Sequence, residues 1–170
     1  KRNIENARDE TRMEIVIEEV LANIGNINKN IDKNDFFVLL QPTSPLRNEI
    51  HIKEALDILI NNDSISLVSV TKTKHPPQKS LIKNSEGKIV PLIDWHTFGQ
   101  PSQSFPNTYI TNGAIYISRI KEFLINKSLY NHPLQIYPMD EKESIDIDTY
   151  EDLDLAKKIL HNNQFWKYYV

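Results

Sequence analysis

Segments with helical and strand patterns alternate along most of this chain, and this alternation restricts the fold more than any other feature. Apolar residues recur at intervals of three and four between positions 9 and 24, which predicts a helix with one face on a core. Residues 36–40 form a short run that is apolar on both faces, as expected of a central strand in a parallel sheet. The two patterns return as a helix at 52–60, strands at 65–70 and 114–117, a helix at 120–125, a strand at 134–137 and a helix at 150–160. We therefore predict an α/β fold, with a mostly parallel, Rossmann-like sheet flanked by helices.

A proline-rich stretch interrupts the alternation at residues 75–110. Its prolines are Pro76, Pro77, Pro91, Pro101 and Pro106. Within it, a polar turn around Gly87 separates two short apolar runs, a pattern that is typical of a hairpin. We expect this stretch to leave the layered core as an arm.

Composition excludes several classes of protein. The chain has 170 residues, enough for one domain with its own core, so residues 1–170 are expected to form a single domain. A net charge of -3 without a basic cluster argues against nucleic-acid binding, because phosphate contacts need grouped Lys and Arg. There are 0 Cys, and no apolar run approaches the ~20 residues of a membrane helix. We expect a cytoplasmic protein with no membrane segment.

The N-terminal side of the sequence lacks two features. The chain starts at Lys1 without an initiator methionine, and its 4 glycines are scattered, so the sequence contains no glycine-rich loop that could cradle phosphates. We therefore expect the domain to be N-terminally incomplete.

The first candidate site follows the strand at 36–40. Gln41 ends that strand and carries both a donor and an acceptor to the sheet edge where α/β proteins bind ligands. Two prolines stiffen the following turn, and Arg47 adds a guanidinium at the same edge. The alternative is a structural turn in which Ser44 or Asn48 caps the next helix. The pattern leaves both interpretations open.

A second candidate site lies in the segment Ser-Ile-Asp-Ile-Asp. If this segment is extended like a strand, Asp146 and Asp148 share one face and can bind one cation. Mg²⁺ prefers such oxygen ligands, often one or two carboxylates together with substrate phosphates. Alternatively, Asp148 with Glu151, or Thr149 with Asp152, starts the last helix as a capping box.

Asn112 and Gly113 form a third candidate site, where the chain enters the strand at 114–117. A glycine here allows a ligand or another part of the backbone to come close, and Asn112 offers an amide for hydrogen bonding. A plain tight turn is the other use of an Asn-Gly pair.

Three motifs occur in a fixed order, and together they are far more specific than any one alone. They are LLQPTSPLR, NGAIYI and SIDIDTYEDL. With them the chain resembles the acylneuraminate cytidylyltransferases, the CMP-sialic acid synthetase family, over nearly its whole length from Arg2. The part without a match is the family's N-terminal segment with its phosphate-binding loop.

The resemblance implies a fold of the nucleotide-diphospho-sugar transferase type and a set of roles. Residues 75–110 would form the family's dimerisation arm in a homodimer. Asp146 and Asp148 would bind Mg²⁺ beside the phosphates and carry the catalysis. Binding of CTP and of a nonulosonic-type sugar acid would involve Arg2, Thr11, Gln41, Arg47, Lys79 and Asn112, with Lys79 reaching toward the sugar site of the partner subunit.

The reaction implied is attack by the anomeric hydroxyl of a 2-keto sugar acid on the α-phosphate of CTP. It needs positioning and charge neutralisation rather than a covalent nucleophile. Where the family often has arginines, this sequence has Ser102 and the pair Ile110-Thr111, which leaves open N-acetylneuraminate or a related nonulosonic acid.

Three alternatives remain at this level. A CMP-sugar-acid synthetase predicts ~60 to 70 further residues upstream, the length of a βα phosphate-binding unit with its neighbouring elements. A truncated, non-catalytic relative would keep the arm without binding a triphosphate. A nucleotidyltransferase for another sugar acid or base is the third alternative. We expect the chain as printed to be inactive by itself.

Overall fold

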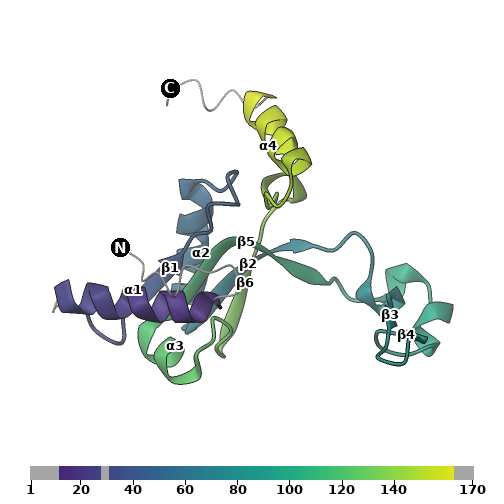
Figure 1. The fold of residues 1–170 in the computed structure, drawn as a ribbon, viewed down its shortest axis with the longest axis horizontal. Coiled ribbons are helices and arrows are strands. Elements are labelled where there is room, and N and C mark those ends of the chain that lie inside the picture. The colour runs from purple at the N-terminus through teal and green to yellow at the C-terminus, as the bar shows by residue number, and fades with distance from the viewer. Residues whose placement is uncertain (1–11, 28–30, 163–170) are drawn as a thin grey trace.

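A computed structural model describes residues 12–27 and 31–162 (Figure 1). Arg2 and Thr11, two of the predicted nucleotide-binding residues, lie outside these ranges. The helices are α1 (Met13–Ile27), α2 (Glu49–Asn61), α3 (Ile120–Asn126) and α4 (Tyr150–Asn162), and the strands are β1 (Phe36–Leu39), β2 (Ser66–Lys72), β3 (Leu81–Lys83), β4 (Ile89–Pro91), β5 (Tyr109–Arg119) and β6 (Leu134–Pro138).

The main sheet has the order β1-β5-β2-β6. The ladder between β2 and β6 is parallel, whereas β5 runs antiparallel to both of its neighbours. Three of the four described strands, β1, β2 and β6, therefore run in the same direction, as a mostly parallel sheet requires, whereas the antiparallel β5 between them makes the sheet mixed. The chain leaves the sheet at the end of β2 and returns as β5 beside the point of departure, so Lys72 pairs with Tyr109 and β5 must run in the opposite direction.

β1 was predicted to be a central parallel strand: it runs in the same direction as β2 and β6, and among the described strands it lies at one edge of the sheet. Its one described neighbour is the antiparallel β5, and Val38 on its outer part is exposed. The apolar run that suggested two buried faces is in fact half-buried over most of its length.

Helices cover both faces of the sheet, as predicted. On one face, Ala55 and Leu59 of α2 pack with β2, β5 and β6 through Leu67, Ile117 and Tyr137. On the other face, α1 and α3 meet the sheet through a cluster around Ile17 and Phe123, in which Phe37 of β1 packs edge-on against Phe123 with ring centroids 5.1 Å apart. This mixed α/β core holds the strand ends that carry the candidate site.

The proline-rich stretch does leave the core. Figure 1 shows it projecting beyond the ends of β2 and β5, with β3 and β4 as a separate two-stranded sheet. The predicted hairpin turn is confirmed at Gly87, which has a positive φ of 78°. The arm is closed at its base by Thr73 and Thr108, since the Thr73 N–H donates to the Thr108 carbonyl at 2.9 Å and their hydroxyls are 2.6 Å apart.

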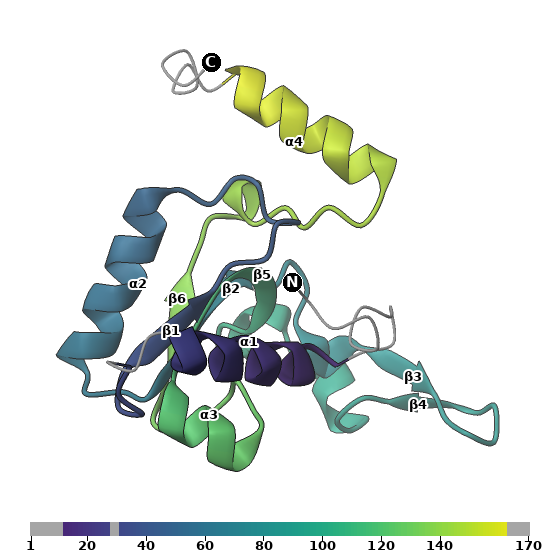
Figure 2. The same ribbon diagram turned by 60° about the vertical axis from the view of Figure 1, so that its left-hand side comes forward.

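α4 begins with a reciprocal cap. The Thr149 N–H and hydroxyl donate to the Asp152 carboxylate at 2.9 and 2.7 Å, and the Asp152 N–H donates to the Thr149 hydroxyl at 3.2 Å. Thus the second of the two predicted capping boxes forms. α4 stands apart from the sheet in Figure 2, at the end of an irregular connection from β6. None of the helices in the described ranges is long and apolar enough to cross a membrane.

Candidate functional site

Three segments converge on Gly113 of β5. A Cβ atom built on Gly113 would lie 2.5 Å from Oε1 of Gln41, 3.3 Å from Oγ of Ser44 and 3.4 Å from Oδ2 of Asp146. Gly113 also has a φ of 73°, in the left-handed region that favours glycine. The sequence predicted a close approach at this position, and the groups that approach are side chains of the chain itself. Gln41 and Asp146, predicted separately from two motifs, therefore lie beside the third motif.

An irregular register between β2 and β5 shapes this meeting point. Val70 pairs with Thr111 and Val68 pairs with Tyr116, so a step of two residues on β2 faces a step of five on β5. The buried side chain of Ser69 supplies hydrogen-bond partners for the extra residues of β5. Its Oγ accepts from the Ile115 N–H at 2.7 Å and donates to Oδ1 of Asn112 at 2.6 Å. Such a bulge redirects the side chains of the longer strand.

Asn112 is 5% exposed, and its amide is used within the protein. Besides the bond from Ser69, its Oδ1 accepts from the Ala114 N–H at 3.2 Å, and its Nδ2 donates to Oγ of Ser144 at 2.9 Å. The side chain thus ties β5 to the segment that leads to Asp146. A direct contact between Asn112 and substrate stays a prediction.

Arg47 also has a structural use. Its Nη1 donates to the backbone carbonyls of Gln41 at 3.1 Å and Ala114 at 2.7 Å. These bonds clamp the turn after β1 onto β5 and hold the backbone of Gln41, while burial lowers the pKa of the guanidinium. Asn48, one of the two predicted caps, does begin α2: its Oδ1 accepts from the N–H groups of Ile50 and His51.

Asp146 and Asp148 are exposed and alternate with the half-buried Ile145 and Ile147, as the pattern predicted. The expected strand does not form, because residues 144–147 have no regular structure. Two backbone bonds hold them, from the Ser144 N–H to the Glu141 carbonyl at 3.2 Å and from the Ile147 N–H to the Thr43 carbonyl at 2.8 Å. Within the ranges that the structure describes, neither carboxylate has a hydrogen bond or ion pair, so both remain able to take a cation.

The donor set agrees with Mg²⁺ held partly by substrate. Two exposed carboxylates supply hard oxygen atoms, and Oε1 of Gln41 lies on the same side of Gly113 as Asp146. Among the described residues, no group of three His, Asp or Glu side chains could hold a metal ion alone. A magnesium ion bound here would need further oxygen ligands from water and substrate phosphates.

Tyr116 is a neighbour that the sequence argument missed. Burial, followed by the proximity of Tyr130, raises the pKa of its hydroxyl to about 12, and Asp146 contributes in the same direction. A hydroxyl with this pKa stays protonated at neutral pH and can act as a neutral donor. The signal was present in NGAIYI, where a tyrosine stands in an otherwise apolar run, but an aromatic residue in a strand is ordinarily explained by packing alone.

Lys79 is not brought to this meeting point within one chain. It lies in a short 3₁₀ turn of the arm, at Pro77–Lys79. Among the contacts of the described residues, none joins Lys79 to Gln41, Gly113 or Asp146.

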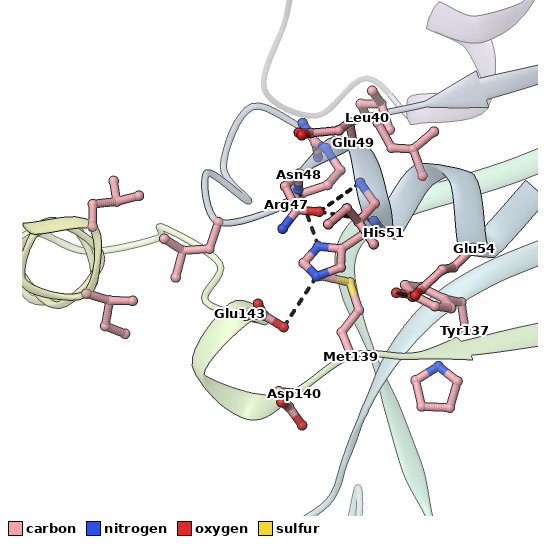
Figure 3. Close-up of a pocket in the computed structure, with 16 residues that line it drawn as sticks. Leu40, Arg47, Asn48, Glu49, His51, Glu54, Tyr137, Met139, Asp140 and Glu143 are labelled. Carbon is pink, nitrogen blue, oxygen red and sulfur yellow. Dashed lines mark hydrogen bonds and ion pairs between the residues drawn. The ribbon is translucent and has the colours of Figure 1, made fainter. Parts of the chain in front are cut away.

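A hollow of about 950 Å³ lies next to the site, between the start of α2, the end of β6 and α4 (Figure 3). Its polar lining includes Arg47, His51, Glu54, Tyr137 and Glu143, whereas Gln41, Asp146 and Asp148 are absent from it. The Tyr137 hydroxyl donates to Glu54 at 2.5 Å, and burial together with this carboxylate raises the pKa of Tyr137. The hollow is therefore separate from the convergence at Gly113.

Known proteins provide an independent comparison. No protein-family model matches the chain. It is 34% identical over 145 residues to an N-acylneuraminate cytidylyltransferase of Streptococcus agalactiae, and 34% identical over 131 residues to a CMP-N,N'-diacetyllegionaminic acid synthase of Legionella pneumophila. It is 27% identical over 134 residues to a pseudaminic acid cytidylyltransferase of Campylobacter jejuni.

These matches cover most of this chain but only part of each relative. The three alignments include 80%, 76% and 77% of the chain, and 35%, 56% and 57% of the respective relatives. The family resemblance that the three motifs indicated is confirmed: over about four fifths of its length, this chain is a relative of the acylneuraminate cytidylyltransferases, matching a part of each.

Proposed function

We propose that the protein to which this chain belongs transfers CMP from CTP to a nonulosonic-type sugar acid. The observation that carries the proposal is the meeting of Gln41, Ser44 and Asp146 at Gly113. Each of the three motifs that match the family contributes to this one point. The relatives support the reaction class, because their names include cytidylyltransferases and a CMP-sugar acid synthase.

The proposed step is a displacement at phosphorus. The oxygen of the anomeric hydroxyl bonds to the α-phosphorus of CTP, the bond from that phosphorus to the bridging oxygen breaks, and pyrophosphate leaves with the electron pair. The hydroxyl proton passes to solvent. A bound Mg²⁺ would neutralise phosphate charge as it develops.

The residues of the chain have distinct parts in this proposal. Asp146 and Asp148 would hold the metal, because their carboxylates are exposed and unpaired among the described residues. Gln41, whose backbone Arg47 holds, would hydrogen-bond the sugar acid with its side-chain amide. Tyr116 lies near enough to Asp146 for this carboxylate to raise the pKa of its hydroxyl, which also interacts with Tyr130 and Thr111.

The identity of the sugar acid is open within one class. Relatives are named for sialic, legionaminic and pseudaminic acids, at identities from 34% down to 27%. Ile110 and Thr111 on β5 stand where the family often has an arginine, which is the natural bidentate partner of a sugar carboxylate. A legionaminic- or pseudaminic-type acid is therefore tested beside N-acetylneuraminate.

A second copy of the chain is proposed as the partner of the arm. The arm exposes a group of large apolar side chains: Leu81, Ile82, Ile89, Leu92, Ile93 and Trp95. Apolar groups gathered on one projecting segment favour burial against another protein surface. In such a homodimer Lys79 would reach the sugar site of the partner subunit.

The decisive experiment measures Mg²⁺-dependent pyrophosphate release from CTP by the complete reading frame. The acceptors are N-acetylneuraminate, a legionaminic acid and a pseudaminic acid. We expect release with one of them, and a loss of about 100-fold in Asp146→Asn or Asp148→Asn, the scale of removing one group that stabilises transition-state charge.

Asp154→Asn is the matched control, since among the described residues this exposed carboxylate on α4 forms an ion pair only with Lys157. It should retain full activity. A folded complete protein that is silent with every acceptor would refute the proposal and favour the non-catalytic relative. If the Asp146→Asn and Asp148→Asn variants are as active as the wild-type protein, the proposed metal-binding role of these two residues is wrong.

A further inference from the structure

His51 is a buried histidine that the proposed reaction does not use. It lies in the first turn of α2 and is 7% exposed. Its Nδ1 accepts from the Asn48 N–H at 3.3 Å, and its Nε2 lies 3.3 Å from Oε2 of Glu143 (Figure 3). One ring therefore joins the start of α2 to the turn after β6.

The two contacts fix the tautomer of the ring. An Nδ1 that accepts from a backbone N–H carries no proton, so the ring proton is on Nε2. The contact with Glu143 is then a hydrogen bond from a neutral imidazole to a carboxylate, rather than an ion pair. Bonds with one charged member are stronger than bonds between neutral groups.

Glu143 belongs to the short turn Glu141–Glu143, which leads directly to the two aspartates. The next residue, Ser144, receives a bond from Asn112 and donates to the Asp140 carbonyl at 2.8 Å. On the far side of Asp146, the Ile147 N–H is held by Thr43. The irregular segment carrying the aspartates is thus anchored to β5, to the turn after β1 and, through Glu143, to α2.

We infer that His51 and Glu143 form a positioning pair that holds the segment 140–148, and with it the carboxylates of Asp146 and Asp148, in place for metal binding. This inference rests on the proposed function for its metal-binding part. Neither residue touches the site: the bond acts by limiting the motion of a segment that has no ladder of its own. Partners that orient metal ligands change metal affinity by roughly 10- to 100-fold when removed.

The first test needs no activity. Hydrogen exchange of backbone amides is measured in the complete protein without metal or nucleotide, for wild type, His51→Ala, Glu143→Ala and Glu143→Gln. We expect about 10-fold faster exchange over 140–148 in both alanine variants. The Gln variant keeps an acceptor for the Nε2 proton and should stay within about 2-fold of wild type.

Two comparisons separate positioning from general destabilisation. His51→Ala also removes half of the α2 capping box, whereas Glu143→Ala leaves that box intact. Exchange within α2 should therefore stay unchanged in Glu143→Ala. Glu141→Ala is the matched control on the same turn, because Glu141 pairs with the exposed Lys74 and such surface pairs contribute little.

The second readout is the Mg²⁺ concentration that gives half-maximal pyrophosphate release. We expect it to rise about 10-fold in His51→Ala and Glu143→Ala, with the maximal rate restored at saturating Mg²⁺. A purely structural role would lower the melting temperature and leave this concentration unchanged.

The outcomes distinguish this inference from the proposed function. Wild-type exchange over 140–148 in Glu143→Ala overturns the pair, as does faster exchange with unchanged Mg²⁺ dependence. If the wild-type complete protein releases no pyrophosphate, the proposed function fails, and the exchange data alone then support or overturn the tether between α2 and the aspartate segment.

Discussion

The junction at Gly113 and the projecting arm differ in the kind of side chain that they bury or expose. At the junction, buried polar groups find partners within the chain: Asn112 with Ser69 and Ser144, and Arg47 with two carbonyls. In the arm, apolar side chains remain on the surface, and the β3–β4 sheet has two strands only. An isolated two-stranded sheet is marginally stable in water. The buried polar groups of the junction are thus paired within the chain, whereas the apolar side chains of the arm would be covered only by a second surface.

The largest difference between the junction and the arm is expected when their two glycines with positive φ are replaced by alanine. Gly113→Ala and Gly87→Ala place a Cβ in the same left-handed region, at a cost of about 1–2 kcal/mol of unfolding free energy each. At Gly113 the new atom also meets Oε1 of Gln41, the mobile end of a flexible side chain, which must move away. We expect Gly113→Ala to reduce pyrophosphate release by about 100-fold.

Gly87→Ala is the matched control, because the nearest atom to its Cβ is Cε of Lys83 at 3.7 Å. Its activity should remain near wild type with a similar loss of stability. Both quantities are measured on the complete protein by denaturant titration and by pyrophosphate assay. Equal activity of the two variants would mean that the position of Gln41 is unimportant.

The arm should respond in association rather than stability. Ile89 and Ile93 are 55% and 56% exposed, so Ile89→Lys with Ile93→Lys should change the unfolding free energy of the monomer by less than ~0.5 kcal/mol. A homodimer through the arm should weaken at least about 10-fold, as measured by sedimentation equilibrium. Ile125→Lys on α3, which is 68% exposed and lies outside the arm, is the control. A dimer that survives the arm substitutions places its interface elsewhere.

The smallest expected effect concerns the cap of α4. Hydrogen bonds from the Thr149 side chain and then from its backbone lower the pKa of Asp152 below its ordinary value of 3.8. A lowered folded-state pKa stabilises the cap above the ordinary value, and this contribution disappears as the pH falls through the folded-state pKa. Helicity by circular dichroism should therefore be slightly lower in Thr149→Val than in wild type at pH 6. The difference should begin to narrow only below about pH 4, and the part that remains at lower pH is the bond from the Asp152 N–H to the Thr149 hydroxyl.

Asp154→Asn, farther along α4, should leave that pH dependence unchanged. A difference between Thr149→Val and wild type that is as large at pH 2 as at pH 6 would show that the cap does not depend on the charge of Asp152.

Local patterns located most elements, because amphipathic periodicity and turn residues are local properties. The helix predicted at 52–60 is α2, the hairpin at Gly87 forms, and the alternation of Ile and Asp before α4 appears as alternating burial. The direction of β5 was beyond reach, since periodicity is the same in both directions along a strand. The strand predicted at the aspartates failed because no neighbouring strand pairs with it.

The sequence predicted several residues of the candidate site but not the hydrogen bonds that join them. The motifs identified Gln41, Asn112 and Asp146, but the structural uses of Asn112 and Arg47 depend on partners far along the chain. Asn112 meets Ser69 across 43 residues, and Arg47 meets the carbonyl of Ala114 across 67. Such pairs are set by tertiary packing, which a single sequence does not reveal.

The closed base of the arm affects which sequence changes the sheet can tolerate during evolution. Thr73 and Thr108 are joined by backbone and hydroxyl contacts. For the stability of the sheet, the chain between them therefore behaves mainly as a loop with fixed ends. The entropy of closing a loop grows slowly with its length. Insertions, deletions and new surfaces between these two threonines can therefore accumulate with little cost to the strands behind them.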